Sequence, residues 1–586
     1  MKRIIYILPL VLFLANTSLS FSQSNVSRDV TLEREYNPTA IDAKKINTVP
    51  KTEEYTIDKK DITYTISSSP ATVDKSFNPL ATDTYKDTQL GEIKNGVFRA
   101  GIGSHWQLLG DFYYPLLQGD TYLLDLNVSH QSAWGKLKIE DNEPTRAMFA
   151  TTRAGFTFEN QFRNSRLVSG IHFLHKGFDY YGKSNIDTSL WVGDTQREIV
   201  KIKADSLLES GIGSFTKAGT NFRLFSTNQQ SSFQHNSNLS YQYFASHIAV
   251  EEHNFYVGTN LSGSLETGRI GVSVDVDNYF YKKPLELSAN YAIKETDFGN
   301  TSVIKLTPYY IFVGKNWDIS MGASLFAIIG ATQRPVSGAA NIVGKAALVP
   351  DLFYLYGGIV GDIKHNSYSS ILTENNYVSP DVSLQDTYTP LNIYTGLKLK
   401  VMDGLLFDGY LGYKIIRDQY FFINRTVNYV APMPIGTPAS AYANTFDVVT
   451  EKDASLLSVD LSLTFDKIDG LDVSVNSRYN KWNVSQNAFA WHKPTWEIGL
   501  QASYQIDAKW KAGIAYNYMG GRNALVDTEV VAMNNIHDVN ATVSYKVFDW
   551  LHVFGSLRNA INANYDTYYG YKAFGINGMV GASVTF

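Results

Sequence analysis

Histidine and serine are the residues of this chain whose chemistry would matter most in catalysis, but their spacing predicts no active site. His172 and His175 are the closest pair among the 11 histidines. Residues three apart on a strand point to opposite faces of the sheet, so these two rings cannot bind one metal ion together. Some lipid hydrolases use a His–Ser pair, and this sequence offers single candidates without such a constellation.

The known signatures of catalytic and cofactor sites are absent from the sequence. There is no nucleophile elbow, phosphate-binding loop, HExxH motif or EF-hand loop, and GIGSHW at Gly101 lacks the spacing of a dinucleotide site. The chain contains no cysteine, which excludes disulfides, thiolate metal centres and a cysteine nucleophile. We interpret Asp87 and Glu92 as solvated surface charges. The sequence therefore predicts that the protein is not an enzyme and has no catalytic, cofactor-binding or metal-binding residues.

The first 22 residues predict export from the cytoplasm. Lys2 and Arg3 precede an apolar run at 4–15, and Ser20 and Ser22 lie three and one positions before a suitable cleavage point. This order of charged, apolar and small residues is that of a signal peptide, and the run is too short to span a bilayer comfortably. The formal net charge of -5 gives no reason to expect a nucleic-acid partner.

From Gly96 to the C-terminus, apolar and polar residues alternate in segment after segment. The ranges 458–465, 496–506 and 538–547 are clear examples. Successive side chains of a strand point to opposite faces, so each segment would have one apolar and one polar face. No long apolar run follows the leader and only 18% of the residues are charged. These properties exclude a polytopic helical membrane protein but agree with a transmembrane barrel.

Short turns and long loops alternate along the region at 94–586. Ten tight turns are expected near Gln118-Gly119, Arg163-Asn164, Asn228-Gln229, Thr267-Gly268, Lys315-Asn316, Pro350-Asp351, Asp403-Gly404, Ile468-Asp469, Asp507-Ala508 and Phe548-Asp549. Longer polar loops are expected at 181–206, 283–300, 369–385, 418–453 and 523–535. Short periplasmic turns and longer external loops are typical of outer-membrane barrels. The pattern predicts an all-β fold, a transmembrane antiparallel β-barrel of about 22 strands with both ends on the periplasmic side.

Aromatic residues and the C-terminus support insertion into an outer membrane. The tryptophans that follow short turns are interpreted as an aromatic girdle at the inner interface: Trp317, Trp510 and Trp550. Tyrosines near strand ends are interpreted as the outer girdle: Tyr113, Tyr114, Tyr180 and Tyr181. The last strand carries on one face Val580, Ala582, Val584 and Phe586. A final strand that ends in an aromatic residue resembles the signal read by the barrel-assembly machinery. The expected surroundings are a lipid bilayer with lipopolysaccharide.

In architecture the chain resembles the TonB-dependent receptors of Gram-negative outer membranes. The apparent barrel size and the terminal Phe586 match that family over 96–586. VTLEREYNPTAIDAKKINTVP at 30–50 and GFDYYG at 177–182 resemble a plugless, receptor-like group. The resemblance implies a barrel that transports or binds a solute. Because residues 23–93 show no pattern of a folded plug, ligand-gated import energised by TonB does not follow from it.

Residues 23–93 are expected to form an extended periplasmic segment with one or two short strands, such as 61–66. An alternating stretch within it comprises Val30, Thr31, Leu32, Glu33, Arg34, Glu35 and Tyr36. An extended strand can add to the sheet edge of another protein. Three interpretations stay open: docking to a TonB-like or other periplasmic or outer-membrane partner, filling of the barrel lumen, or disorder.

Two functions compete on these grounds. The wide barrel and its long loops favour porin-like or receptor-like solute uptake, or ligand binding. The missing plug favours the alternative, a non-transporting structural or accessory subunit of a multi-protein outer-membrane complex, for example in barrel assembly, with the N-terminal segment as a tether. A lipid hydrolase is a third class, for which no residue is nominated. The barrel size places uptake slightly ahead.

Overall fold

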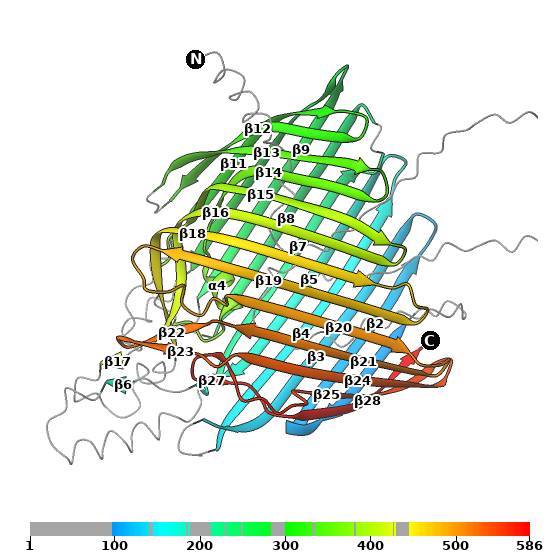
Figure 1. Cartoon of the computed structure of the whole chain (residues 1–586), viewed down its shortest axis with the longest axis vertical. Coiled ribbons are helices and arrows are strands. Elements are labelled where there is room, and N and C mark those ends of the chain that lie inside the picture. Colours follow the sequence, from blue (N-terminus) through cyan, green and yellow to red (C-terminus); the bar gives the residue numbers. More distant parts are fainter. Residues whose placement is uncertain are drawn as a thin grey trace, which may run out of the picture.

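The computed structural model describes residues 96–139, 144–182, 186–187, 212–228, 231–247, 250–282, 299–330, 334–379, 382–425, 427–428 and 445–586. These residues form an antiparallel β-barrel that closes where the first strand, β1 (Val97–Gly103), pairs with the last strand, β28 (Asn577–Thr585) (Figure 1). The predicted signal peptide at 1–22 and the segment at 23–93 lie outside the described residues. In the part of the chain that the structure describes, no helix is long and apolar enough to cross a membrane.

The barrel wall has 22 strands, as the spacing of the turns predicts. Two of the 24 strands in the main sheet, β22 (Asn523–Val526) and β23 (Glu529–Ala532), form a hairpin in a loop, which leaves 22 in the wall. Between β1 and β28 the wall contains β2 (Gln107–Gln118), β3 (Tyr122–Lys138), β4 (Pro144–Gln161), β5 (Ser165–Asp179), β7 (Ile212–Ser226), β8 (Phe233–Ser246), β9 (Glu251–Leu265), β10 (Gly268–Lys282), β11 (Thr301–Val313), β12 (Trp317–Ile329), β13 (Val336–Val349), β14 (Phe353–Lys364), β15 (Thr387–Met402), β16 (Leu405–Asn424), β18 (Phe446–Phe465), β19 (Leu471–Val484), β20 (Trp496–Gln505), β21 (Trp510–Gly520), β24 (Ile536–Phe548) and β25 (Leu551–Arg558). The loops carry η1 (Ser104–Trp106), β6 (Ile186–Asp187), α4 (Tyr368–Glu374), β17 (Val427–Asn428), β26 (Asp566–Tyr568) and β27 (Tyr571–Lys572).

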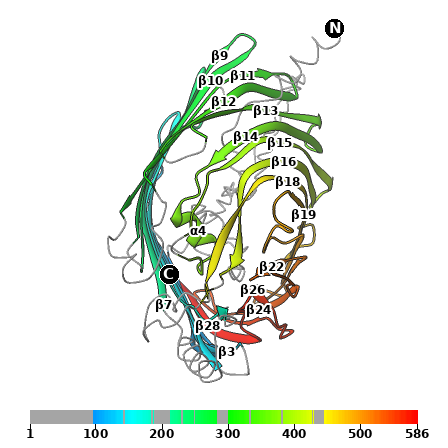
Figure 2. The same ribbon diagram turned by 90° about the vertical axis from the view of Figure 1, so that its left-hand side faces the viewer.

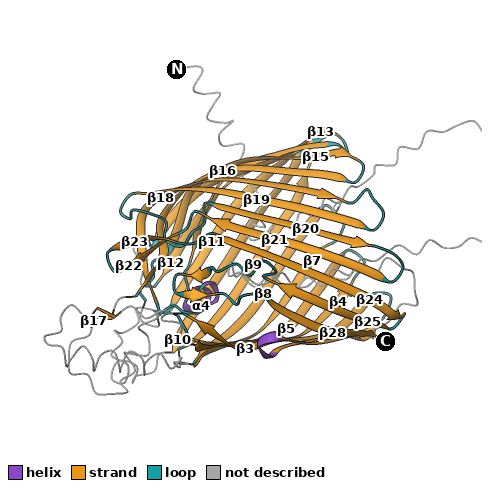
Figure 3. Cartoon of the chain, turned by 60° about the horizontal axis from the view of Figure 1, so that its bottom comes forward, coloured by secondary structure: helices purple, strands orange, loops and turns teal. Residues whose placement is uncertain are grey.

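The ten predicted short turns lie at one end of the barrel. The long loops lie at the other end, together with the three-residue connection η1 between β1 and β2. All ten predicted short turns join consecutive wall strands, at the end where Val97 pairs with Thr585. Figure 3 shows these connections as teal segments between neighbouring strands. The loop expected at 418–453 is shorter than predicted, because β16 and β18 stay paired as far as Asn424 and Phe446. We call the long-loop end external and the short-turn end periplasmic.

The two faces of the wall differ as the alternation predicts. Large apolar side chains are exposed on the outward face, such as Ile270 at 55% and Val580 at 65%. Residues an odd number of positions from Ile270 along β10 point into the barrel, and they include Asp275 and Asp277. An apolar exterior around a polar interior is the arrangement of a barrel embedded in an outer membrane.

The strands at the closure are the shortest of the wall. β1, β25 and β28 have 7, 8 and 9 residues, whereas β16 and β18 have 20 each. The wall is therefore lowest where the sheet closes on itself.

Candidate functional site at the mouth of the barrel

The connection between β14 and β15 folds into the barrel at its external end. It contains α4, which lies inside the ring of strands (Figure 2). Tyr368, Ile371 and Leu372 recur at helical spacing on one face of α4 and are at most 2% exposed. We call residues 365–379 and 382–386 the inward loop.

A buried aromatic and aliphatic cluster joins the inward loop to both sides of the barrel. Its fourteen members are Phe178, Tyr180, Phe215, Phe244, Val250, Tyr368, Ile371, Leu372, Val378, Val382, Tyr420, Phe422, Phe446 and Tyr571. Those from β5, β7 and β8 belong to one side of the wall, and those from β16 and β18 belong to the other. The inward loop therefore bridges the mouth from wall to wall. We call these fourteen side chains the mouth cluster.

The GFDYYG stretch at 177–182 lies in the mouth cluster. Phe178 and Tyr180 pack edge-on against Tyr377 of the inward loop, with ring centroids 5.8 and 6.3 Å apart. Tyr377 stacks in turn on Tyr571, with centroids 3.5 Å apart and planes at 18°. The motif thus packs against Tyr377 of the inward loop, and Tyr377 also contacts the loop between β25 and β28.

Two further residues of the motif hold its backbone in place. Asp179 is fully buried and accepts two hydrogen bonds from the guanidinium of Arg146, each 2.9 Å long. Gly182 approaches Tyr571 so closely that a Cβ there would lie 2.3 Å from the ring. The motif therefore needs glycine at this position, because any side chain would displace the tyrosine.

Two buried ionisable side chains hold α4 at its first and last turns. The Lys217 ammonium on β7 donates to the hydroxyl of Thr373 at 2.6 Å and to the carbonyl of Ser369 at 3.4 Å. The Glu252 carboxylate on β9 accepts the backbone N–H of Ser369 at 3.0 Å. Both charged residues are buried, with 7% and 1% of their surface exposed. Buried charges are stable only when paired and hydrogen-bonded, so these contacts fix where α4 sits.

The last residue of α4 forms a second charged contact with the mouth. Lys493, in the loop between β19 and β20, donates to Glu374 Oε1 at 2.6 Å, and Tyr420 donates to the other carboxylate oxygen. Burial alone would raise the pKa of Glu374. The charge and hydrogen bond of Lys493 outweigh it, with help from Tyr420, and lower the pKa to about 2. Glu374 is therefore an anion that links the inward loop to Tyr420 of β16 and to Lys493 of the loop between β19 and β20.

A buried histidine lies beside this contact. His492 is 7% exposed and packs between the rings of Phe446 and Tyr568, at centroid distances of 5.3 and 5.6 Å. Neither ring nitrogen has a hydrogen-bond partner among the described residues. Burial, reinforced by the positive charges of Arg522 and Lys493, lowers its pKa to about 3, so the ring is neutral at ordinary pH.

The tryptophans predicted to form an inner girdle lie beside short turns, and their side chains are exposed. The exposed fractions of Trp317, Trp510 and Trp550 are 43%, 43% and 48%. Their positions at the periplasmic end of the wall agree with contact with lipid there. The girdle itself stays a prediction.

The C-terminal residues predicted to form an assembly signal lie at the barrel closure. Val580, Ala582 and Val584 are residues of β28, and Phe586 follows it directly. Their role in assembly stays a prediction.

The prediction of an outer tyrosine girdle is wrong for the residues chosen. Tyr180 is buried in the mouth cluster, and Tyr181 packs against that cluster from the same loop. Tyr113 pairs with Val97 and Tyr114 packs on Phe586, so both lie at the periplasmic end of the wall. Position near a strand end was too coarse a criterion, because it says neither which end nor which face.

The two histidines that are closest in the sequence cannot bind one metal ion together. His172 and His175 lie on opposite faces of β5, since His175 shares the face of exposed Ile171 and Phe173. Within the described ranges, no group of three or more metal-ligating side chains is placed to hold an ion. The predicted docking segment at 30–36 lies outside the described residues.

Sequence reasoning missed the inward loop, which was expected only as a polar external loop at 369–385. One signal for it was present. Tyr368, Ile371 and Leu372 have the spacing of an amphipathic helix face, and such a face needs something to pack against.

Comparison with known proteins gives a likeness in structure only. No protein-family model matches the sequence, and no curated protein matches it significantly. The FrpB iron transporter from Neisseria meningitidis is similar, with a TM-score of 0.60 and 10% identity over 85% of this chain and 82% of that one. The siderophore receptor PirA from Acinetobacter baumannii gives 0.59 and 10%, over 85% and 81%. The pyoverdine outer membrane receptor FpvA from Pseudomonas aeruginosa gives 0.58 and 11%, over 84% and 78%.

These three proteins are transporters or receptors and not enzymes. With its closed 22-strand wall and apolar exterior, the chain is an outer-membrane barrel with the fold of the TonB-dependent receptors.

Proposed function

We propose that the chain is an outer-membrane uptake barrel that binds a solute at its external loops and admits it when the inward loop moves. The observation that carries the proposal is the position of that loop, which bridges the mouth from β7 and β9 to β16 and β18. A loop held there by the mouth cluster and a few charged contacts can act as a gate, because its release leaves the strand pairing of the wall unchanged.

A polar surface begins directly inside the inward loop and supports this reading. His365 of the loop packs on Tyr279 of β10, with ring centroids 4.5 Å apart, and the Tyr279 hydroxyl donates to Asp277 at 2.7 Å. Further along the same face, Tyr256 donates to Asp275 at 2.5 Å. Hydroxyls and carboxylates along the wall would form hydrogen bonds with a polar solute in place of water on its way to the periplasm.

The names of the similar proteins favour the same class of function. FrpB is named as an iron transporter and PirA as a siderophore receptor. The proposal for this chain stops at solute uptake, because nothing in the mouth of the described barrel identifies a substrate.

Conductance in planar bilayers tests the gate. We expect the full chain to stay closed and a variant with 367–379 replaced by a short Gly-Ser linker to open a steady pore. Shortening the β22–β23 hairpin is the matched control, because that external loop is not part of the mouth cluster. A variant as tightly sealed as the full chain would show that the inward loop is not the barrier.

The alternative, a structural or accessory subunit, draws support from the extent of the mouth cluster. Fourteen buried side chains make a stable closure, whereas segments that move in function usually have few buried contacts. Gentle solubilisation followed by mass measurement separates the two functions. A discrete complex larger than the barrel supports the subunit role, and a lone barrel argues against it.

For the N-terminal segment we propose docking of Val30–Tyr36 onto a TonB-like or other periplasmic protein through strand addition. The chain has no cysteine, so a single Thr31→Cys variant can be labelled without background. Labelling by a bulky maleimide from the periplasmic side is expected, and protection from it would favour a segment held in the lumen.

A further inference from the structure

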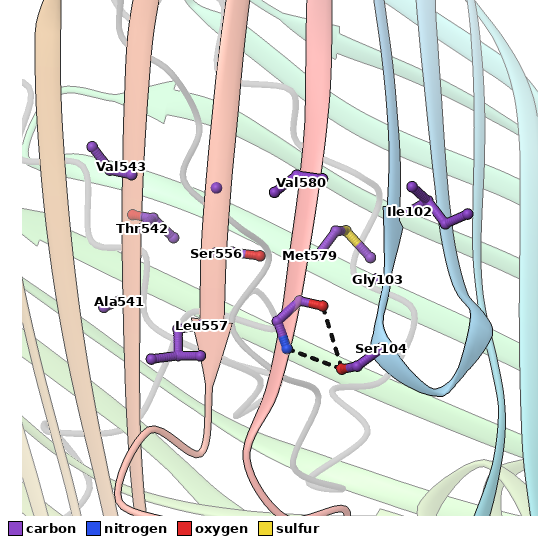
Figure 4. A pocket seen from close by; sticks show the side chains of 12 residues that line it. Ile102, Gly103, Ser104, Ala541, Thr542, Val543, Ser556, Leu557, Met579 and Val580 are labelled. Atoms are coloured by element: carbon purple, nitrogen blue, oxygen red, sulfur yellow. Dashed lines mark hydrogen bonds between the residues drawn. The ribbon is translucent and has the colours of Figure 1, made fainter.

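An apolar groove lies on the outward face of the wall where the barrel closes (Figure 4). It crosses β24, β25, β28 and β1 and has a volume of about 610 Å³. One exposed apolar side chain from each strand borders it: Val543, Leu557, Val580 and Ile102. Their exposed fractions of 38% to 65% show that no other described part of the chain covers the groove.

Two glycines form the floor of the groove. Gly555 pairs with Val543 and Val580, and Gly578 pairs with Leu557, so both glycines lie on the same face as the border side chains. A Cβ added at either glycine would be 3.6 Å from its nearest neighbour, which is ordinary contact. Packing within the barrel therefore does not require glycine here. Glycine inside a strand often marks the close approach of a ligand.

The groove belongs to the external half of the wall. Ser104, directly after β1, lies at its external end, where the hydroxyl accepts a hydrogen bond from Gly578 N at 3.0 Å (Figure 4). Trp106, two residues further, is 73% exposed. Its backbone φ of 48° lies in the left-handed region, which bulky residues rarely adopt. Tryptophan settles at the level of lipid headgroups, so Trp106 is positioned as an interfacial anchor just outside the groove.

We propose that this groove binds one hydrocarbon chain of an outer-leaflet lipid, with the lipid headgroup beside Trp106. The groove is continuous with the apolar outward face, and its border and floor are apolar side chains and glycine backbone. The hydroxyl-bearing residues of its lining are Ser104, Thr542 and Ser556. A turn of α-helix is a cylinder about 10 Å wide and about 5.4 Å long, or about 420 Å³. The groove would hold only about one and a half such turns, so it suits a lipid chain better than the spanning helix of a partner protein.

Photocrosslinking of the full chain in nanodiscs tests the proposal. The probe is phosphatidylcholine with a diazirine in the middle of one acyl chain. We expect peptides with Leu557 and Val580 to be labelled at least tenfold more than the peptide with Leu239, an exposed residue of β8. A Gly555→Leu or Gly578→Leu substitution fills the floor and is expected to reduce that labelling about tenfold, the equivalent of about two methylene groups less burial.

The matched control is Gly263→Leu on β9. An added Cβ there meets no atom within 4 Å, and its partners Ile270 and Phe233 are exposed on the outward face. It is expected to leave labelling of the groove unchanged. Equal labelling around the whole wall, or labelling that resists both filling substitutions, would overturn the proposal.

A second readout does not depend on the glycine variants. A nitroxide on Val580→Cys is expected to be more immobilised in lipid than in a short-chain detergent, whereas one on Leu239→Cys is not. Equal mobility at the two positions in lipid would also overturn the proposal.

Discussion

The backbone of Phe586 exchanges two hydrogen bonds with that of Gly96. Gly96 N donates to Phe586 O at 2.8 Å, and Phe586 N donates to Gly96 O at 3.0 Å. The last residue of the chain therefore pairs with the residue that opens the barrel, and its ring packs on Tyr114 at a centroid distance of 6.0 Å. Closure of the wall along this edge therefore uses backbone groups from both ends of the barrel sequence.

This pairing makes the closure sensitive to side-chain volume at Gly96. A Gly96→Val substitution is expected to lower the yield of folded barrel, because the new Cβ would lie 2.7 Å from the Phe586 ring. Phe586→Ala should lower the free energy of unfolding by about 1–2 kcal/mol, less than for a fully buried ring because half of this ring is exposed. The folded fraction in unheated gels measures both effects. Phe548→Ala, which removes another exposed ring at the same end, is the control and should fold normally.

Tyr571→Ala is expected to release the inward loop while leaving the wall intact. The substitution removes the 3.5 Å stack on Tyr377 and the contact with Gly182, at a cost of about 3–5 kcal/mol for a buried aromatic ring. Limited proteolysis should then cut within 365–379 faster than in the unsubstituted chain. Phe574→Ala, a ring of the same loop outside the mouth cluster, provides the comparison. Equal resistance of residues 365–379 to proteolysis in the two variants would show that the Tyr571–Tyr377 stack does not hold the inward loop.

Loss of the Glu374 charge is expected to weaken the same loop at the end of α4, three residues before Tyr377. Glu374→Gln should cost about 1–3 kcal/mol, because the Lys493 ammonium loses its ionic partner. Adding Lys493→Met to it should recover part of that loss, since no unpaired charge then remains. Hydrogen exchange in α4 reports the effect. Lys400→Gln, which breaks an exposed pair with Asp403, should change nothing measurable.

The pH dependence of that contact follows from the direction of the pKa shift. The pKa of Glu374 in the folded chain, about 2, is below its ordinary value of 4.5. Its stabilising contribution is therefore complete above about pH 4.5 and is lost as the pH falls toward 2. Exchange of α4 should accelerate over this interval in the full chain and stay flat in Glu374→Gln.

His492 predicts a second pH effect in a different interval. Its folded pKa of about 3 lies below the ordinary 6.5, so protonation favours the unfolded loop. The loop between β19 and β20 should lose stability as the pH falls below 6.5, by up to about 1.4 kcal/mol per unit until about pH 3. His492→Asn should abolish this slope, since asparagine does not titrate and tolerates the φ of 60°. His175→Asn should keep it.

The wall of the barrel could be predicted because its signals are local. Period-2 alternation and tight turns are properties of neighbouring residues, and they located the ten short turns at the periplasmic end, such as Asp403-Gly404 and Asp507-Ala508. The same signals misjudged the 418–453 loop, since the external ends of β16 and β18 turn inward and carry apolar residues on both faces, for example Phe421 and Phe422.

The mouth could not be predicted because its contacts join residues far apart in the sequence. Tyr377 meets Tyr571 and Phe178, and Ser369 meets Glu252, across separations that no local pattern encodes. GFDYYG was noticed as a resemblance, but its role depends on partners that only the folded chain brings together. Gly182 is required because Tyr571 lies against it, and Asp179 is required because it accepts hydrogen bonds from Arg146.

The uneven height of the wall has a consequence for the surrounding bilayer. Seven residues of β1, at about 3.3 Å each and tilted by about 45°, reach across only about 16 Å of a hydrocarbon layer that is about 30 Å thick. The much longer β16 and β18 exceed that thickness. Lipids on one flank must therefore compress or the cylinder must lean, and either response gives the protein a preferred orientation among its neighbours in the membrane plane.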